Sequence, residues 1–570
     1  MKPQQPINRR AFLGLTAAFG VASTGLALSS CSPDRTANEP DAVEADAVPN
    51  STSAQAGERL GAWYGTAPVI SVDDVVETID TDVLICGAGH SGCACAVAMG
   101  SMGVGSTIVI EKNGSIGTGR EYIGAINTSA QKSSGVECDP MEAVSELARY
   151  ASYRCDASLI KLWADNSGEA LDFFADELSE YGITHVAETD IGDGYHGAYK
   201  IGNVHTKLIV PEGENFLPFM QRKAESYGVQ FMFETPLMSV IKDEAGKVVG
   251  AYASTAEGYV RINASKGVVL ACGGYANDAD LMAQLNPIDQ QVVILDTSNF
   301  GSTGDGIKAG IWAGGIKDDV ASAMVFDRAI GAPGISGGYP YQGAGFFMNF
   351  GSQPFLRTTF SGKRFCNEAA PYDYTLHAAW VADPHHVCYT FWDANYYRNA
   401  EAFHTVGCSR IVPSDSDPST GEGGGEEAMN ATLEIYSDLI QSADTWEELA
   451  EKIGMDPSQL IATIDRYNEL AEKGVDEDFG KPAKDMIALN TPPYYAVVLG
   501  GTLLTTMDGL RVNGDLSVID GETFEPISGL YAIGDNSGGF FSGTYPELYV
   551  GIAAGRSLTW AYLVAKELAE

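Results

Sequence analysis

The stretch TDVLICGAGHSGCACAVAMGSMGVGSTIVIEK, residues 81–112, restricts the possible folds more than any other part of this 570-residue chain. Its order of apolar run, glycine-rich turn, small-residue run and second apolar run predicts strand, turn, helix and strand. In the turn, Gly87 allows a sharp bend, Gly89 lets a pyrophosphate approach the backbone, and Gly92 allows the helix to pack closely on the strand. Glu111 ends the second strand, where a carboxylate binds ribose hydroxyls. The stretch therefore predicts a dinucleotide site in a doubly wound α/β fold.

A late segment indicates which dinucleotide is bound. ISGLYAIGDNSGG, residues 527–539, predicts a strand followed by Gly534 and Asp535. Flavin-binding proteins use such a strand and acid to close on the ribityl chain, which a nicotinamide-binding domain does not need. KGVVLACGGYANDADLM (266–282) and GSTGDGIKAG (301–310) add two more glycine turns beside apolar runs. The ordered set predicts FAD rather than NAD.

The first 31 residues have the pattern of a targeting segment. Paired Arg9 and Arg10 in NRRAFLG precede an apolar run that ends in LSSC at Cys31. This pattern predicts twin-arginine export, and the lipobox-like end predicts a lipid anchor at Cys31 on an extracytoplasmic surface. An uncleaved anchor or ordinary cleavage are the alternatives. Residues 32–78, which contain many Pro, Ser, Ala, Asp and Glu residues, are expected to form a flexible acidic linker.

Charge and cysteine usage exclude several classes of function. A formal net charge of −40 argues against a nucleic-acid partner. Of the ten cysteines, Cys86 and Cys272 lie in strand-like runs, where a thiol acts as a small hydrophobic group. The chain has no CxxCH motif and no closely spaced group of four cysteines, so neither haem nor an iron–sulfur cluster is predicted. The eight histidines show no metal-binding spacing, so no metal site is predicted.

The order GAGHSG, GGYAND, TGDGIKAG, GKRFCNE, PPYYAV and LYAIGD resembles the fumarate-reductase-type flavoprotein family over residues 79–570. The resemblance implies noncovalent FAD and a doubly wound, Rossmann-like FAD-binding domain formed by residues 79–319 and 491–570. It also implies an inserted α+β capping domain, residues 320–490. Within it, residues 444–474 independently predict two amphipathic helices separated by an Asp-Pro turn. The residues expected at the cofactor are Gly87, Gly89, His90, Ser91, Gly92, Glu111, Lys112, Asn127, Gly273, Gly274, Thr303, Gly304, Asp305, Gly534, Asp535, Gly551 and Ile552.

The substrate side departs from this family at three places. Fumarate-type members hold a dicarboxylate with histidines and an arginine, and a second arginine delivers a proton. The matching stretch LLTTMDG places Leu504 and Thr505 at the histidine positions. FSGTYPEL places Tyr545 at the clamping arginine, and Tyr372 falls at the proton-donating arginine. Because an anion buried without its arginine carries a desolvation penalty of several kcal/mol, these changes argue against fumarate as the substrate.

Tyrosines replace the lost cations. A phenol can donate a hydrogen bond to a ketone or pass a proton to a carbon beside one. The replacement resembles ketosteroid dehydrogenases, which carry Tyr-Pro in this loop, although they usually continue with Gly where this chain has Glu547. The expected catalytic residues are Tyr372, Tyr545 and Tyr495, and the expected substrate-binding residues are Thr505, Phe540, Phe541, Tyr494 and Arg364.

These features predict an extracytoplasmic FAD-dependent reductase of a C=C bond conjugated to a carbonyl. The expected substrate is a largely apolar small molecule, such as a steroid-like, phenylpropenoid or related enone. The resemblance implies a separate electron donor, a membrane-linked cytochrome or flavoprotein. The alternatives are a ketosteroid-type dehydrogenase working in the oxidative direction, a fumarate or dicarboxylate reductase, and a non-enzymatic exported binding lipoprotein.

Overall fold

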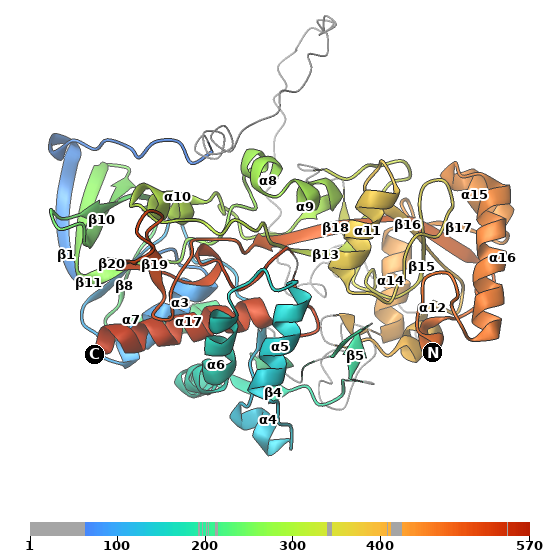
Figure 1. Cartoon of the computed structure of the whole chain (residues 1–570), viewed down its shortest axis with the longest axis horizontal. Helices are drawn as coiled ribbons and strands as arrows, with labels where there is room; N and C mark the ends of the chain where they lie inside the picture. The colour runs from blue at the N-terminus through green and yellow to red at the C-terminus, as the bar shows by residue number, and fades with distance from the viewer. Residues whose placement is uncertain are drawn as a thin grey trace, which may run out of the picture.

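The computed structural model describes residues 63–191, 194–196, 198–200, 202, 205–210, 215–338, 345–406, 409–411, 425–543 and 545–570. Arg9, Arg10, Cys31 and most of the predicted linker lie outside the described residues. Two groups of strands and helices lie side by side along the long axis of the molecule, and the long strand β18 (Tyr494–Thr506) extends between them (Figure 1).

An eight-stranded sheet forms the centre of the first group. Its order is β19-β20-β11-β1-β2-β8, with β10 and β9 continuing beside β11. The pairs β11–β20, β1–β11, β1–β2 and β2–β8 are parallel. Val83, Leu84 and Ile85 are fully buried, as expected for a strand of a covered parallel sheet. The predicted doubly wound α/β class is therefore confirmed. The strands are β1 (Val75–Cys86), β2 (Thr107–Ile110), β8 (Gln230–Met232), β9 (Leu237–Lys242), β10 (Val248–Thr255), β11 (Gly258–Leu270), β19 (Ser517–Ile519) and β20 (Pro526–Ala532).

Helices cover this sheet and carry the cofactor motifs at their ends. Helix α3 (His90–Ser101) follows the first glycine turn, and it packs against α7 (Leu217–Ser226) and α17 (Ile552–Ala569). Three shorter helices follow β11 along the chain: α8 (Ala279–Leu285), α9 (Pro287–Val292) and α10 (Asp305–Trp312).

The first strand begins earlier than predicted. We expected the linker to continue to residue 78, but β1 already pairs with β11 from Val75 onward. Its partner β11 is 13 residues long and also forms an antiparallel pair with β10. This long partner offers backbone hydrogen-bonding groups to the residues before Asp82, so they join the sheet.

A seven-stranded sheet forms the second group. Its order is β14-β13-β18-β16-β15, and β12 and β17 also pair with β18. The sheet includes β12 before residue 320 and β18 after residue 490, so it extends beyond the predicted cap at both ends. Its strands are β12 (Val293–Asp296), β13 (Ala323–Gly331), β14 (Phe346–Phe347), β15 (Leu356–Thr358), β16 (Cys388–Trp392), β17 (Gln441–Ala443) and β18.

Two helices at one end of this group correspond to the predicted amphipathic pair. They are α15 (Trp446–Ile453) and α16 (Pro457–Lys473). Between them, the side chain of Asp456 caps α16 by accepting a hydrogen bond from the backbone of Ser458, and Pro457 occupies the first helical position. The other helices of this group are α11 (Tyr372–Ala382), α12 (Tyr396–Phe403) and α14 (Gly425–Ile435).

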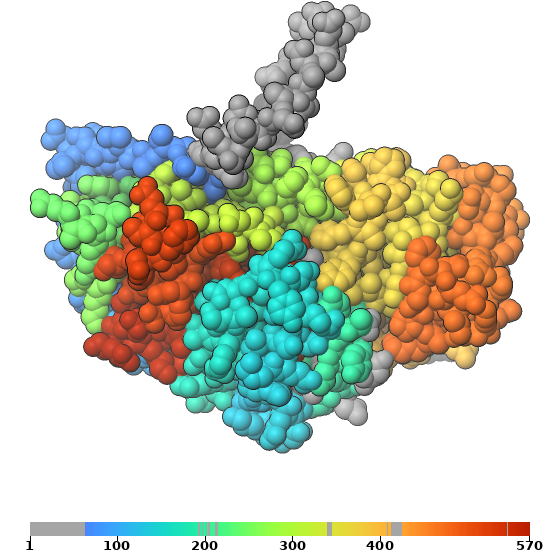
Figure 2. Space-filling model, in the orientation of Figure 1, coloured from blue at the N-terminus to red at the C-terminus, as the bar shows by residue number. Residues whose placement is uncertain are grey.

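A smaller α+β segment lies against both groups on the face that Figure 2 shows. It contains the three-stranded sheet β3-β7-β4 and the strand pair β5–β6. No helix among the described residues is long and apolar enough to cross a membrane. The elements of this segment are β3 (Tyr122–Gly124), β4 (Thr184–Ala187), β5 (Tyr195–His196), β6 (Tyr199–Lys200), β7 (His205–Ile209), α4 (Ser129–Ser133), α5 (Pro140–Tyr150) and α6 (Ala157–Leu178).

Candidate active site

The first glycine turn has the geometry that its spacing predicts. Gly87 has a φ of +106°, and a Cβ there would lie 2.4 Å from the carbonyl oxygen of Ala271. A Cβ on Gly92 would lie 1.9 Å from the carbonyl oxygen of Gly87, so helix α3 starts in direct backbone contact with the turn. Gly89 is different, because a Cβ there meets no atom within 4 Å. The turn is closed on two sides and open at Gly89, which lines a pocket.

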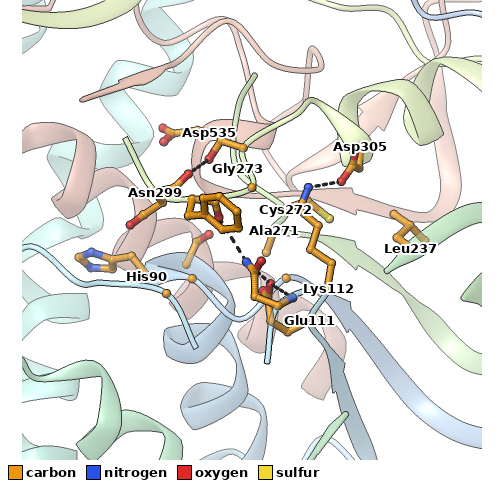
Figure 3. A pocket seen from close by; sticks show the side chains of 18 of the residues that line it. His90, Glu111, Lys112, Leu237, Ala271, Cys272, Gly273, Asn299, Asp305 and Asp535 are labelled. Carbon is orange, nitrogen blue, oxygen red and sulfur yellow. Dashed lines mark hydrogen bonds and ion pairs between the residues drawn. The ribbon is translucent and has the colours of Figure 1, made fainter. Parts of the chain in front are cut away.

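Glu111 lines the same pocket and is held in place by backbone groups. One carboxylate oxygen accepts a hydrogen bond from Ala88 N at 2.8 Å. The other accepts from the backbone and the side-chain amide of Asn113, each at 2.9 Å. The carboxylate therefore sits beside the glycine turn, where a ribose bound in the pocket would reach it (Figure 3). Asn113, which anchors this acid, is not among the residues predicted from the sequence.

The turn of residues 301–305 closes another side of the pocket. Lys112 Nζ lies 2.6 Å from the carboxylate of Asp305 (Figure 3). It also lies 2.8 Å from Thr303 Oγ1. Gly304 adopts a φ of +76° and donates its backbone N–H to the carbonyl of Gly274 at 3.0 Å. These contacts connect the end of β2 to the start of α10 across the pocket. Gly273 also lines the pocket.

The late strand brings an acid to the pocket together with a cation that the sequence analysis missed. Asp535 accepts hydrogen bonds from Thr505 Oγ1 at 2.8 Å and from Arg556 Nη2 at 2.9 Å. Arg556 is fully buried in α17 and also donates to the carbonyl of Gly534 at 3.0 Å. Burial lowers the pKa of Arg556 and raises that of Asp535. The sequence feature that could have indicated Arg556 is its position directly after GIAAG, in the first turns of the last helix.

The lining of this pocket suits FAD. His90 lines the pocket, and within the described part of the chain its Nε2 atom is buried without a hydrogen-bond partner. Burial lowers the pKa of His90 to about 4, and the charge of Arg120 adds to the effect, so the ring is neutral at pH 7. Ser91 lies beside it at the N-terminus of α3, where backbone N–H groups bind phosphate. An unpartnered ring nitrogen and an open glycine turn match a polar pyrophosphate.

Eight of the seventeen expected cofactor residues do not line this pocket. Five of them adjoin residues that do line it in the sequence: Gly92, Gly274, Thr303, Gly304 and Gly534. The other three are Asn127, Gly551 and Ile552. The side chain of Asn127 exchanges hydrogen bonds with the backbone of Cys138 at 2.9 and 3.0 Å, so it secures a loop. Gly551, with a φ of +74°, precedes α17 and accepts a hydrogen bond from Gly124 N at 2.8 Å. Ile552 begins α17 and is fully buried. The structure thus gives the Asn127 side chain a structural partner instead of a place in the pocket.

Tyr372 and Tyr545 are brought into one apolar cluster. Each residue is 3 % exposed. The Tyr372 ring packs edge-on against Phe326 at 4.7 Å, and the Tyr545 ring lies 5.8 Å from that of Phe541. Glu547, two residues after Tyr545, accepts a hydrogen bond from the backbone N–H of Tyr372 at 3.4 Å. The loop that carries one tyrosine is therefore attached to the helix start that carries the other.

The predicted aromatic wall has two different parts. The Phe541 ring lies under the guanidinium of Arg556 at 4.8 Å, which joins it to the Asp535 cluster. Phe540 packs edge-on between Trp163 and Trp560, with centroid distances of 6.3 and 6.0 Å. Phe540 therefore packs among core aromatic rings, and its place at the substrate stays a prediction.

The structure also places two expected substrate-side residues away from the cofactor pocket. Tyr494 stacks on Trp446 at 4.0 Å, and Tyr495 stacks on Trp392 at 5.8 Å. Both begin β18, whereas Thr505 lies near its other end, about 33 Å away at roughly 3.3 Å per residue. Tyr495 as a catalytic residue and Tyr494 as a substrate-binding residue therefore do not agree with the structure.

Arg364 is likewise unavailable to a substrate. Its guanidinium forms two-point contacts with Glu368, at 2.8 Å each, and with Asp476, at 2.9 and 2.8 Å. The side chain is buried, and both acids are fully buried as side chains. Its expected substrate-binding role is corrected to a structural one, because two carboxylates already neutralise it.

The glycine turn, Glu111 and the late acid Asp535 define a flavin-binding α/β oxidoreductase. A family model described as an FAD binding domain matches residues 82–547, and the protein belongs to this family. It is 25% identical over 481 residues to a vinyl phenol reductase from Lactiplantibacillus plantarum, covering 83% of this chain and 93% of that one. It is also 25% identical over 580 residues to a digoxin reductase from Eggerthella lenta, covering 95% of this chain and 93% of that one.

A solved structure shows the same fold. The 3-ketosteroid Δ1-dehydrogenase of Sterolibacterium denitrificans matches with a TM-score of 0.64 and 18% identity, over 86% of this chain and 99% of that one. Fumarate reductases are also among the relatives. The protein is an FAD-dependent oxidoreductase of this family, and its relatives include reductases and 3-oxosteroid 1-dehydrogenases.

Proposed function

We propose that the protein reduces a C=C bond conjugated to a carbonyl in an uncharged, largely apolar molecule, such as a steroid-like or phenylpropenoid enone. The observation that carries the proposal is the buried pair Tyr372 and Tyr545, at positions where the fumarate-type pattern has arginines. Reductases of vinyl phenol and digoxin among the relatives support the reductive direction.

The chain's own residues supply the proton side of this reaction. When bound, FAD supplies hydride-transfer chemistry. A phenol, whose ordinary pKa is about 10, stays protonated at neutral pH and donates a hydrogen bond to a carbonyl. Either tyrosine can then deliver its proton to the carbon next to that carbonyl. The apolar rings of Phe326 and Phe541 exclude water beside these phenols.

The ion pairs around the site disfavour an anionic substrate. Arg357 is paired with Asp327, Arg364 with two acids, and Arg556 with Asp535. A substrate carboxylate would have to compete with these buried carboxylates for a guanidinium, or enter without one, at a cost of several kcal/mol.

The oxidative direction is the second candidate function. The 3-oxosteroid 1-dehydrogenases among the relatives favour it. The direction then follows from the potential of the electron partner, which we propose is a separate membrane-linked cytochrome or flavoprotein. We further propose export by the twin-arginine route with a lipid at Cys31. Reduction of the flavin by a saturated 3-ketosteroid, without reoxidation by an enone, would favour the oxidative candidate.

Anaerobic reoxidation of the reduced flavin tests the proposal. We expect benzalacetone, a neutral aryl enone, to reoxidise the flavin and fumarate to do so slowly. Tyr545→Phe should slow reoxidation about a hundredfold while leaving the FAD content unchanged, because only a hydroxyl is removed. Tyr549→Phe, which removes a hydroxyl from the same loop, is the matched control and should react as the wild type does. Rapid reoxidation by fumarate would contradict the proposal.

A further inference from the structure

A second cavity, of about 330 Å³, adjoins Tyr372 and the loop that carries Tyr545. Tyr372 lines it from α11, and Glu547 and Leu548 line it from the loop that carries Tyr545. Ile191 and His196 complete the wall on the side of the smaller α+β segment. The volume lies within the range of roughly 300–1,000 Å³ that is usual for small-molecule sites. A substrate held at the tyrosines could therefore extend into this cavity.

The charges of the cavity wall select against anions. Four carboxylates line it, those of Asp327, Glu368, Asp485 and Glu547. Lys484 is the single lysine or arginine among its described lining residues, and its Nζ lies 3.0 Å from Asp485. A substrate carboxylate placed here would lie among acidic groups, and it would have to compete with Asp485 for Lys484.

Two of these acids are fully engaged by arginines. Asp327 accepts hydrogen bonds from Arg357 and from Ser352, the latter at 2.6 Å. Both oxygens of Glu368 face Arg364 at 2.8 Å. These acids contribute to the potential of the cavity but have little capacity to bind a ligand.

Glu547 has the capacity that Asp327 and Glu368 lack. Its side chain is 8 % exposed. One oxygen lies 2.6 Å from His196 Nδ1, and the other accepts the 3.4 Å hydrogen bond from Tyr372 N. An ionised carboxylate has about four acceptor positions, so the two contacts that Glu547 makes with described residues leave room for a ligand donor. The contact with His196 holds the carboxylate at the cavity wall.

We infer that this cavity binds the distal end of the substrate through a hydroxyl group that donates a hydrogen bond to Glu547. The inference rests on the proposed function, and it narrows the substrate class to enones with a hydroxyl on the far side of an aromatic or fused ring. It also explains a departure in the sequence, because Glu547 stands where the Tyr-Pro-Gly pattern has a glycine without a side chain. Glu547 is thus a specificity residue beside the reacting tyrosines.

Three ring-substituted forms of benzalacetone test the inference by anaerobic reoxidation of the reduced wild-type protein. They carry a hydroxyl, a methoxy group or a carboxylate at the para position. We expect the hydroxyl compound to have a half-saturation concentration about tenfold lower than the methoxy compound, because only the hydroxyl can donate to Glu547. The carboxylate compound should bind most weakly.

Variants of Glu547 then test whether this residue causes the preference for the hydroxyl compound. Glu547→Leu should abolish the preference for hydroxyl over methoxy, and Glu547→Gln should improve the half-saturation concentration of the carboxylate compound. Each variant is judged by the ratio of its half-saturation concentrations for two compounds, so a change in its limiting rate does not affect the comparison. Glu142→Gln is the matched control, because it removes the same charge from another carboxylate–cation pair, 2.6 Å from Lys200 and away from the cavity.

The outcomes separate the two proposals. If benzalacetone reoxidises the flavin but the wild type does not prefer the hydroxyl compound, or the Glu547 variants keep the wild-type preferences, the inference about this cavity is wrong and the proposed function stands. If none of the enones reoxidises the flavin, the proposed function fails, and the inference that rests on it fails with it.

Discussion

Replacing Gly89 by alanine separates cofactor binding from folding. Gly89 has a φ of −82° and a ψ of −162°, an extended conformation that alanine adopts freely. Because a Cβ there meets no atom within 4 Å, we expect the stability of the FAD-free protein to change by less than about 0.5 kcal/mol. The methyl group would enter the space that a pyrophosphate approaches. We therefore expect FAD binding to weaken about 10- to 100-fold, or roughly 1.4–2.7 kcal/mol.

Gly87→Ala should instead lower the stability of the FAD-free protein. Its φ of +106° is unfavourable for alanine, and its Cβ would lie 2.4 Å from a carbonyl oxygen that cannot move away. Backbone strain and the clash together should destabilise the FAD-free protein by roughly 2–5 kcal/mol. Gly514→Ala is the control, since its Cβ also meets nothing within 4 Å and it does not line the pocket.

Two measurements on each deflavinated variant separate an effect on stability from an effect on FAD binding. The midpoint of thermal unfolding reports stability, and titration with FAD, followed by quenching of flavin fluorescence, reports the dissociation constant. If Gly89→Ala binds FAD within twofold of the wild type, the open side of the turn does not face the cofactor. If it loses as much stability as Gly87→Ala, the space at Gly89 is filled in the folded protein.

Two buried ionisable groups, Asp373 and Arg364, give separate predictions. Burial raises the pKa of Asp373 from its usual 3.8 to about 7, so the folded state holds a proton that the unfolded state releases, and stability falls as the pH rises from about 4 to 7. Asp373→Asn should remove a change of up to roughly 4 kcal/mol in the free energy of unfolding over this pH range. The plot of unfolding temperature against pH should therefore be flatter for the variant. Equal slopes in the variant and the wild type would contradict this prediction. Arg364→Ala leaves Glu368 and Asp476 buried without their guanidinium, so we expect about 3–5 kcal/mol of destabilisation with unchanged turnover per bound flavin. If the variant is as stable as the wild type but has lost turnover, Arg364 binds the substrate after all.

The features that the sequence predicted correctly depend on residues close together in the chain. The turn of Gly87, Gly89 and Gly92 needs only its own strand and helix, and Glu111 follows from the length of that unit. The helix pair α15 and α16 follows from its apolar period and from the cap at Asp456. Backbone sterics and local periodicity determine such features, so they can be recognised without knowing what packs around them.

The tertiary structure decided which side chains share a site. Tyr495 and Thr505 belong to one strand, yet the length of β18 places them at opposite ends of that strand. Arg364 is predicted from the sequence to bind the substrate, and only the fold brings Asp476 against it. Arg556 and the His196–Glu547 pair depend on contacts between segments far apart in the chain. Such contacts follow from strand register and burial, and the electrostatic role of a charged group is set by the partners that folding brings within hydrogen-bond distance.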